Sequence, residues 1–131
     1  MPEKPIGIAM VICDQIIEDT ATQKRSLIGL FNAVYAADFP TTLHKLCVFV
    51  SVTQLNGSVT LELVCHNETK GDPILKAVGV AQSSDPNGVL EIGFEFDKMS
   101  LPSPGLYCFE LLHEGEIVLQ RRFNVLRLSS T

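Results

Sequence analysis

Two side chains of this sequence, Cys47 and His66, could do nucleophilic or metal chemistry together. They are predicted to lie near each other on the outer face of one β-hairpin. A cysteine thiolate beside an imidazole is a nucleophile, and the same pair is half of a metal site. A metal would need two more ligands, and the other histidines, His44 and His113, fall at a strand entrance and at a turn tip. We therefore interpret Cys47 and His66 as an incidental cross-strand pair.

Carboxylates in or beside the predicted loops offer a second chemistry, because hard oxygen ligands that converge at one end of a β-sandwich bind calcium. The residues concerned are Asp14, Glu18, Asp19, Asp85 and Asp97. The alternative interpretation is that they are turn residues and surface charges, and Asp85 precedes a proline as turn residues often do. We predict no metal ligand and no cofactor, and keep calcium binding as an alternative function.

Arg121 is predicted on the inward parity of its strand, beside Tyr107 or Phe109. It could stack on an aromatic ring while its head group reaches solvent at the edge, or a β-bulge could rotate it outward. A substrate-binding role for it is the less favoured interpretation. The sequence contains no G-x-S-x-G, P-loop, H-E-x-x-H or dinucleotide fingerprint. We predict that the protein is not an enzyme.

Apolar side chains on faces that should contact water are the more suggestive feature. Phe49 and Val64 are predicted on the outer side of the central hairpin, and Leu112 and Val118 on the outer side of the last hairpin. If the four merge into one patch, a protein partner or a second copy of the chain would cover it. Scattered surface apolar residues are the alternative.

The element that must position these residues is a hairpin over residues 46–65. Asn56-Gly57 between two apolar runs favours a two-residue type I′ turn, since both residues tolerate a positive φ. That register places one set of residues on the dry face and Cys47 and His66 on the other. The predicted dry face consists of Val48, Val50, Val52, Val59, Leu61, Leu63 and Cys65.

The remaining strands are predicted from alternation and from turn residues. Residues 7–17 and 26–31 pair as a hairpin, residues 32–43 cross between sheets, and residues 74–82 form a further strand. Asp85-Pro86-Asn87-Gly88 is typical of a type I turn. In residues 90–96 the inward residues Leu90, Ile92, Phe94 and Phe96 alternate with Glu91, Gly93 and Glu95, which face water. The last hairpin spans residues 106–128 and is predicted to turn through three residues, His113-Glu114-Gly115. A loop of this length places Tyr107, Phe109 and Leu111 on the same inward face as Ile117, Leu119, Phe123 and Val125.

The pattern indicates an all-β fold, an antiparallel β-sandwich of about eight strands with little or no helix, in one domain over residues 1–131. A closed barrel is the alternative. The net charge of −5 argues against nucleic acid or an anionic membrane as a partner.

The four cysteines, Cys13, Cys47, Cys65 and Cys108, all fall inside predicted strands and form no C-x-x-C pair. Buried thiols of this kind are typical of a reducing compartment, so we predict a cytoplasmic protein. The apolar run at residues 6–13 lacks a cleavage site and is interpreted as a buried strand rather than an export signal.

Several short motifs carry a resemblance that covers most of the chain: Ile12-Cys13-Asp14-Gln15, the run from Ser26 to Phe31, Phe39-Pro40, and Pro104-Gly105-Leu106-Tyr107. They resemble a family of uncharacterised small bacterial proteins, a domain of unknown function. The resemblance implies a bacterial β-sandwich and supplies no catalytic or binding residue.

Gly105-Leu106-Tyr107 also looks like the tyrosine corner of immunoglobulin-like domains, in which the hydroxyl bonds the backbone upstream. The chain departs from that family in having no Trp and no paired inter-sheet cysteines. The resemblance implies immunoglobulin-like architecture.

Three functions follow in order. The leading hypothesis is a non-enzymatic module that binds a protein partner or its own copy through an outer sheet face or an edge strand. The alternative is a small-ligand or calcium-binding β-sandwich. An enzyme that uses Cys47 and His66 is the third.

Overall fold

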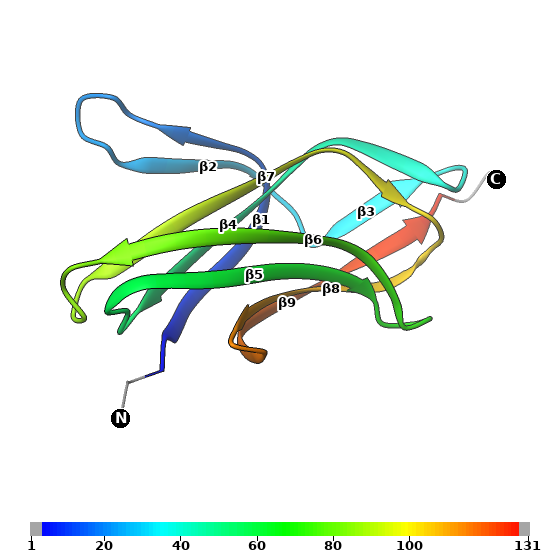
Figure 1. Ribbon diagram of the computed structural model, residues 1–131. Helices are drawn as coiled ribbons and strands as arrows, with labels where there is room; N and C mark the ends of the chain where they lie inside the picture. Colours follow the sequence, from blue (N-terminus) through cyan, green and yellow to red (C-terminus); the bar gives the residue numbers. More distant parts are fainter. Residues whose placement is uncertain (1–3, 129–131) are drawn as a thin grey trace.

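Nine strands in two sheets make up the fold (Figure 1). The structure is a computed structural model and describes residues 4–128, so the ends of the predicted domain, residues 1–3 and 129–131, lie outside the described residues. The strands are β1 (Ile6–Glu18), β2 (Arg25–Leu30), β3 (Ala33–Ala36), β4 (Thr41–Thr53), β5 (Gly57–Asn67), β6 (Asp72–Ser83), β7 (Val89–Leu101), β8 (Gly105–His113) and β9 (Glu116–Arg127).

The strands form two packed sheets rather than one closed barrel. Sheet A has the order β2-β1-β4-β7, and sheet B has the order β3-β9-β8-β5-β6. The all-β prediction is confirmed, since residues 4–128 contain no helix. The strand count exceeds the predicted eight because residues 33–36, inside the predicted crossover, pair with β9 as a short parallel strand.

The core lies between the sheets and has the composition that alternation predicts. Val48, Val50 and Val52 of β4 are fully buried on one wall. Leu61 and Leu63 of β5, on the other wall, are equally buried. Tyr107, Phe109 and Phe123 fill the middle of the core, and adjacent ring centroids lie 5.5 Å apart.

The hairpin predicted at Asn56-Gly57 is wrong, because β4 and β5 belong to different sheets. β4 pairs with β1 and β7, and β5 pairs with β6 and β8, so neither has an edge free for the other. Residues 54–56 instead carry the chain across from sheet A to sheet B. Leu55 is only 2% exposed, and its burial at the end of the core favours this crossing over a solvent-exposed turn.

The last hairpin keeps its predicted inward face but not its predicted loop. Glu114 and Gly115 have φ of 50° and 81°, and His113 lies opposite Glu116, so the turn has two residues. The extra residue lies in the strand, where the register changes between Leu111 and Leu112. This β-bulge restores the parity of Leu119 and Phe123 but leaves Ile117, which was predicted to point inward, 54% exposed.

Along both sides of the sandwich, a glycine lies where the edges of the two sheets approach each other. A Cβ at Gly7 of β1 would collide with Leu119 of β9, so only glycine permits that approach. On the opposite side, a Cβ at Gly79 of β6 would lie 3.4 Å from the ring of Phe94 on β7. The two sheets therefore meet along β1 and β9 on one side and along β6 and β7 on the other.

Residues 14–29, which we call the arm, form the outer part of the predicted β1–β2 hairpin, whose pairing is confirmed (Figure 1). Ile16 of the arm lies 3.0 Å from the position that a Cβ of Gly93 would occupy. The Arg25 guanidinium is 3.0 Å from the Glu91 carboxylate of β7. The arm thus contacts the outer face of sheet A.

Candidate interaction surface and polar cluster

The four residues predicted as an interaction surface do not form one patch. Phe49 lies on β4 in sheet A, whereas Val64, Leu112 and Val118 lie on strands of sheet B. Phe49 is directly opposite Gly93, the residue that Ile16 approaches, so the arm contacts the surface beside it. Val118, at the bulge, packs against the core instead of pointing outward. The error at Phe49 follows from the wrong hairpin, which placed residues of two sheets on one face, and the error at Val118 follows from the bulge.

Val64 and Leu112 do share the outer face of sheet B, and exposed residues that the sequence analysis missed extend the surface. Val78 and Val80 on β6 are 58% and 68% exposed, and Ile117 on β9 is 54% exposed. Val78, Glu62, Leu112 and Ile117 follow one another across β6, β5, β8 and β9. We call this surface the outer patch, and it consists of Val64, Val78, Val80, Leu112 and Ile117.

A sequence signal for the missed valines exists. From Leu75 to Gln82, the odd-numbered residues are leucine, alanine and glycine, and the even-numbered residues are lysine, two valines and glutamine. The odd-numbered residues face the core, where Gly79 fits against Phe94. The valines must then face outward.

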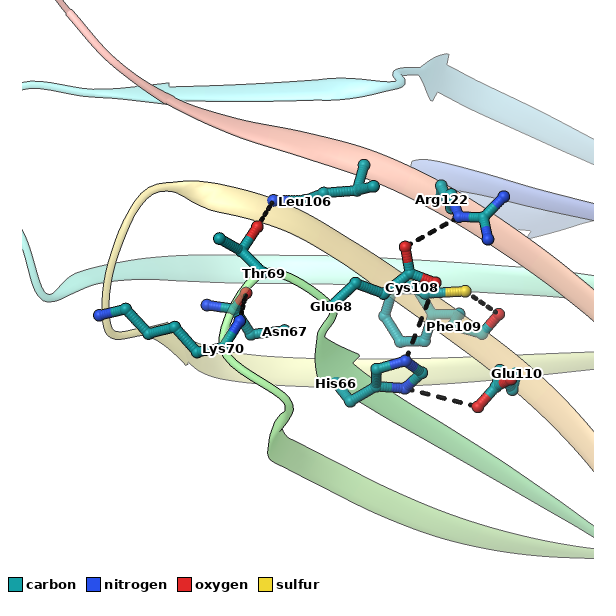
Figure 2. Close-up of polar contacts among 10 residues, drawn as sticks. All are labelled: His66, Asn67, Glu68, Thr69, Lys70, Leu106, Cys108, Phe109, Glu110 and Arg122. Atoms are coloured by element: carbon teal, nitrogen blue, oxygen red, sulfur yellow. Dashed lines mark hydrogen bonds and ion pairs between the residues drawn. The ribbon is translucent and has the colours of Figure 1, made fainter.

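A polar cluster lies on the same outer face, centred on His66 (Figure 2). His66 Nδ1 is 3.4 Å from Glu110 Oε1, and His66 Nε2 is 4.0 Å from Glu68 Oε1. Glu68 Oε2 accepts a 2.9 Å hydrogen bond from Arg122 Nε, which raises the pKa of the guanidinium. The cluster joins β5, β8 and β9 across the sheet.

The loop after β5 holds Glu68 in place. The Glu68 N–H donates to the Leu106 carbonyl at 2.8 Å, and the Leu106 N–H donates to Thr69 Oγ1 at 2.9 Å (Figure 2). Asn67 is 1% exposed, and its Oδ1 accepts from the Lys70 N–H. These bonds tie the loop to the start of β8.

His66 has a cysteine partner across the strands, but it is Cys108 and not Cys47. Burial, followed by the charges of Glu68 and Glu110, raises the pKa of the Cys108 thiol to about 11. An activated cysteine needs the opposite shift, because the thiolate is the nucleophile. The cluster therefore holds Cys108 as a neutral thiol.

Cys47, the other member of the predicted pair, lies in sheet A opposite Cys13. Both are buried free thiols, and the Cys47 Sγ donates to the Asp14 carbonyl. Burial raises the pKa of both thiols. The predicted contact between Cys47 and His66 is wrong, because the two residues lie in different layers.

The acidic residues proposed for calcium do not converge. Asp19 Oδ1 accepts from the Ala21 N–H at the tip of the arm, and Asp85 Oδ1 accepts from the Asn87 N–H in the β6–β7 turn. Within residues 4–128, no three His, Cys, Asp or Glu side chains lie close enough to hold a metal ion. For Asp19 and Asp85 the geometry is that of the turn residues in the alternative interpretation.

Arg121 lies opposite Phe109, as predicted, and its guanidinium donates to Asn32 Oδ1 at the edge of the sheet. The chain enters β8 as the tyrosine-corner resemblance implies. The fully buried Tyr107 donates its hydroxyl to the Ser103 carbonyl at 2.7 Å.

A hollow of about 710 Å³ lies where the two sheets end beside the β4–β5 crossing. Leu55, Val59 and Pro86 supply apolar surface to it. Lys4 and Glu116 form an ion pair at its rim with 2.8 Å between Nζ and Oε2, which lowers the pKa of Glu116. The volume is in the range of small-ligand sites.

The sequence profile of a family of unknown function, DUF6941, matches residues 8–126. The chain belongs to this family. No curated protein matches the DUF6941 chain significantly.

Among solved structures, the DUF6941 chain is similar to the Pseudomonas fluorescens alkylpurine DNA glycosylase AlkC bound to DNA containing an abasic site analog. The match has 11% identity and a TM-score of 0.47, and it covers 91% of this chain but 30% of the glycosylase chain, so it carries no functional argument. No helix in the described part of the DUF6941 chain is long and apolar enough to cross a membrane.

Proposed function

We propose that this DUF6941 protein is a bacterial, cytoplasmic interaction module of immunoglobulin-like architecture, without enzymatic activity, that binds a protein through the outer patch. The hydrogen bond of Tyr107 at the entry to β8 and the two packed sheets support the architecture. Four buried free thiols support a reducing compartment.

The exposure of the outer patch carries the proposal. Val78, Val80 and Ile117 are each more than half exposed, and Val64 and Leu112 lie between them on the same face. Apolar side chains grouped on one face of a sheet favour a covering partner, whereas isolated ones do not. Glu62 lies between Val78 and Leu112 and is paired with a cation, since Lys76 Nζ lies 3.5 Å from Glu62 Oε2.

Affinity capture from the native host tests the proposal. Immobilised wild-type protein should retain a protein that the Leu112→Glu variant loses, because a second carboxylate directly opposite Glu62 adds a charge that is costly to desolvate. Leu126→Glu is the matched control, since Leu126 is 42% exposed on β9 away from the patch and its variant should retain that protein. Identical capture by wild type and Leu112→Glu would contradict the proposal.

The hollow near Leu55 favours a second function, the binding of a small ligand. Its apolar wall and the rim formed by Lys4 and Glu116 suit a ligand with one apolar and one polar end. A thermal-shift screen of small molecules tests this function, since a ligand that binds only the folded state raises the melting temperature. Hits should disappear in a Val59→Trp variant that fills the hollow, and an unchanged hit list would contradict the assignment.

A further inference from the structure

We infer that β6 pairs edge to edge with β6 of a second copy, around a two-fold axis at Gly79. This inference goes beyond the proposed function: it places a second copy of the chain at the edge of sheet B, beside Val78 and Val80, and leaves the face around Leu112 for the protein partner. β6 has a free edge, few features that block pairing, and a self-complementary sequence.

β6 is the last strand of sheet B and pairs only with β5 among the described strands (Figure 1). From Leu75 to Ser83 its register with β5 is regular, because the only irregularity lies near its beginning, opposite Cys65 and His66. Every second residue of such a strand directs its N–H and C=O groups away from the sheet. A further extended strand is the structure that satisfies a row of these groups.

The other edges of the two sheets carry features that oppose pairing. β7 directs Glu91, Glu95 and Asp97 outward, β3 is only four residues long, and β2 has six residues and contains Gly29 at a φ of 74°. β6 is twelve residues long, contains no proline after Pro73, and carries one charged side chain after Asp72, Lys76. Glu62 on the neighbouring strand already neutralises that lysine.

An antiparallel pairing centred on Gly79 is self-complementary. It places Val78 opposite Val80 of the second copy and, by symmetry, Val80 opposite Val78, so that four exposed valines cover one another. Lys76 then lies opposite Gln82, which carries no charge, and Ala77 lies opposite Ala81 on the inward side. No like charges face each other across the axis, which removes the usual electrostatic penalty for pairing identical strands.

A charge-swap experiment tests the pairing. One variant carries Val78→Lys and Val80→Lys, and the other carries Val78→Glu and Val80→Glu. Wild type should be a dimer in light scattering after size exclusion, and each variant alone should self-associate at least about tenfold more weakly, because like charges then face each other. An equimolar mixture should recover a dimer, because lysine faces glutamate at both positions. The melting temperature of each variant reports its folding, and both sites are more than half exposed.

Disulfide cross-linking tests the register. Under mild oxidation, a mixture of Val78→Cys and Val80→Cys copies should cross-link faster than either variant alone, because these positions are directly opposite in the proposed pair. The four native cysteines are at most 1% exposed and serve as the uncross-linked background. Equal rates in the mixture and in the single variants would overturn the two-fold axis at Gly79.

The face variant Leu112→Glu separates this inference from the proposed function. It should leave the wild-type dimer intact, because Leu112 is on β8 and away from the edge. A dimer that dissociates with Leu112→Glu would overturn edge pairing and support association through the face. A wild-type monomer that still captures a protein in a Leu112-dependent way would also overturn edge pairing while leaving the proposed function standing.

Discussion

The hydroxyl of Tyr107 donates a 2.7 Å hydrogen bond to the carbonyl of Ser103, four residues earlier in the chain. The bond joins the core of sheet B to the segment that connects β7 of sheet A with β8. Tyr107 is fully buried and its ring packs against Phe123, so the hydroxyl is the only polar group on a side chain that is otherwise part of the core. This hydrogen bond therefore helps to fix where the chain enters β8, together with the bonds between Leu106 and the loop after β5.

Replacing Tyr107 with Phe should lower the free energy of unfolding by about 1 kcal/mol, because the Ser103 carbonyl loses its partner while the ring remains. Urea denaturation monitored by circular dichroism measures the loss. Tyr35→Phe is the matched control, since Tyr35 is 61% exposed and its variant should unfold like wild type. Equal stability of the two variants would mean that the bond contributes nothing measurable.

Leu55→Ala should lower the free energy of unfolding by about 2–4 kcal/mol, since removal of a buried leucine leaves a cavity that the surroundings fill only in part. Leu55 is 2% exposed although it lies outside any strand. Leu30→Ala, at a site 64% exposed, should cost less than about 0.5 kcal/mol in the same denaturation experiment. A small loss at Leu55 would contradict its role in closing the end of the core.

Leu55 also shows why the inward residues could be predicted while the pairing could not. The alternation of buried and exposed side chains is a property of each strand by itself. The sequence therefore predicts which residues are buried, as in the rows Val48 to Val52 and Leu61 to Cys65. These rows are buried whether the two strands form a hairpin or lie in different sheets. The difference depends on distant strands, β1 and β7, which occupy both edges of β4. The candidate sites that assumed the hairpin, Cys47 with His66 and Phe49 with Val64, were therefore wrong.

In the last hairpin, the sequence predicts the inward face but not the structure of the turn. Its inward parity requires one extra residue between Leu111 and Leu119, and the sequence establishes that requirement. Whether the extra residue lies in the loop or in a bulge depends on which of Ile117 and Val118 packs against the core, and in the structure Val118 does. Gly115 is compatible with both solutions, because a G1 bulge and a type I′ turn each use a glycine at positive φ.

The two-residue turn predicts a stabilising substitution. Glu114 has a φ of 50°, a region that asparagine tolerates better than glutamate, so Glu114→Asn should raise the free energy of unfolding by about 0.5 kcal/mol. Thermal denaturation of Glu116→Asn provides the control, because the same change at a strand position should bring no gain. A less stable Glu114→Asn variant would contradict the turn geometry.

Gly115→Ala should have the opposite effect. Gly115 has a φ of 81°, and nothing lies within 4 Å of the position that a Cβ would occupy, so the penalty is one of backbone conformation and not of crowding. We expect a loss of about 1 kcal/mol in the free energy of unfolding. An unchanged melting temperature would show that the turn relaxes to accept alanine.

Cys108 predicts a loss of stability at alkaline pH. Burial, with the charges of Glu68 and Glu110, raises its pKa to about 11 from the ordinary value of 9.0. Between these values the unfolded chain releases the thiol proton while the folded chain keeps it. The contribution of Cys108 to stability is therefore complete below pH 9 and falls as the pH rises toward 11.

Urea denaturation of wild type and Cys108→Ser at about pH 7.5 and about pH 10.5 measures this difference. Wild type should lose more stability than the variant, because Cys65 and the other titrating groups are common to both. Equal losses would show that the folded chain does not hold the Cys108 proton.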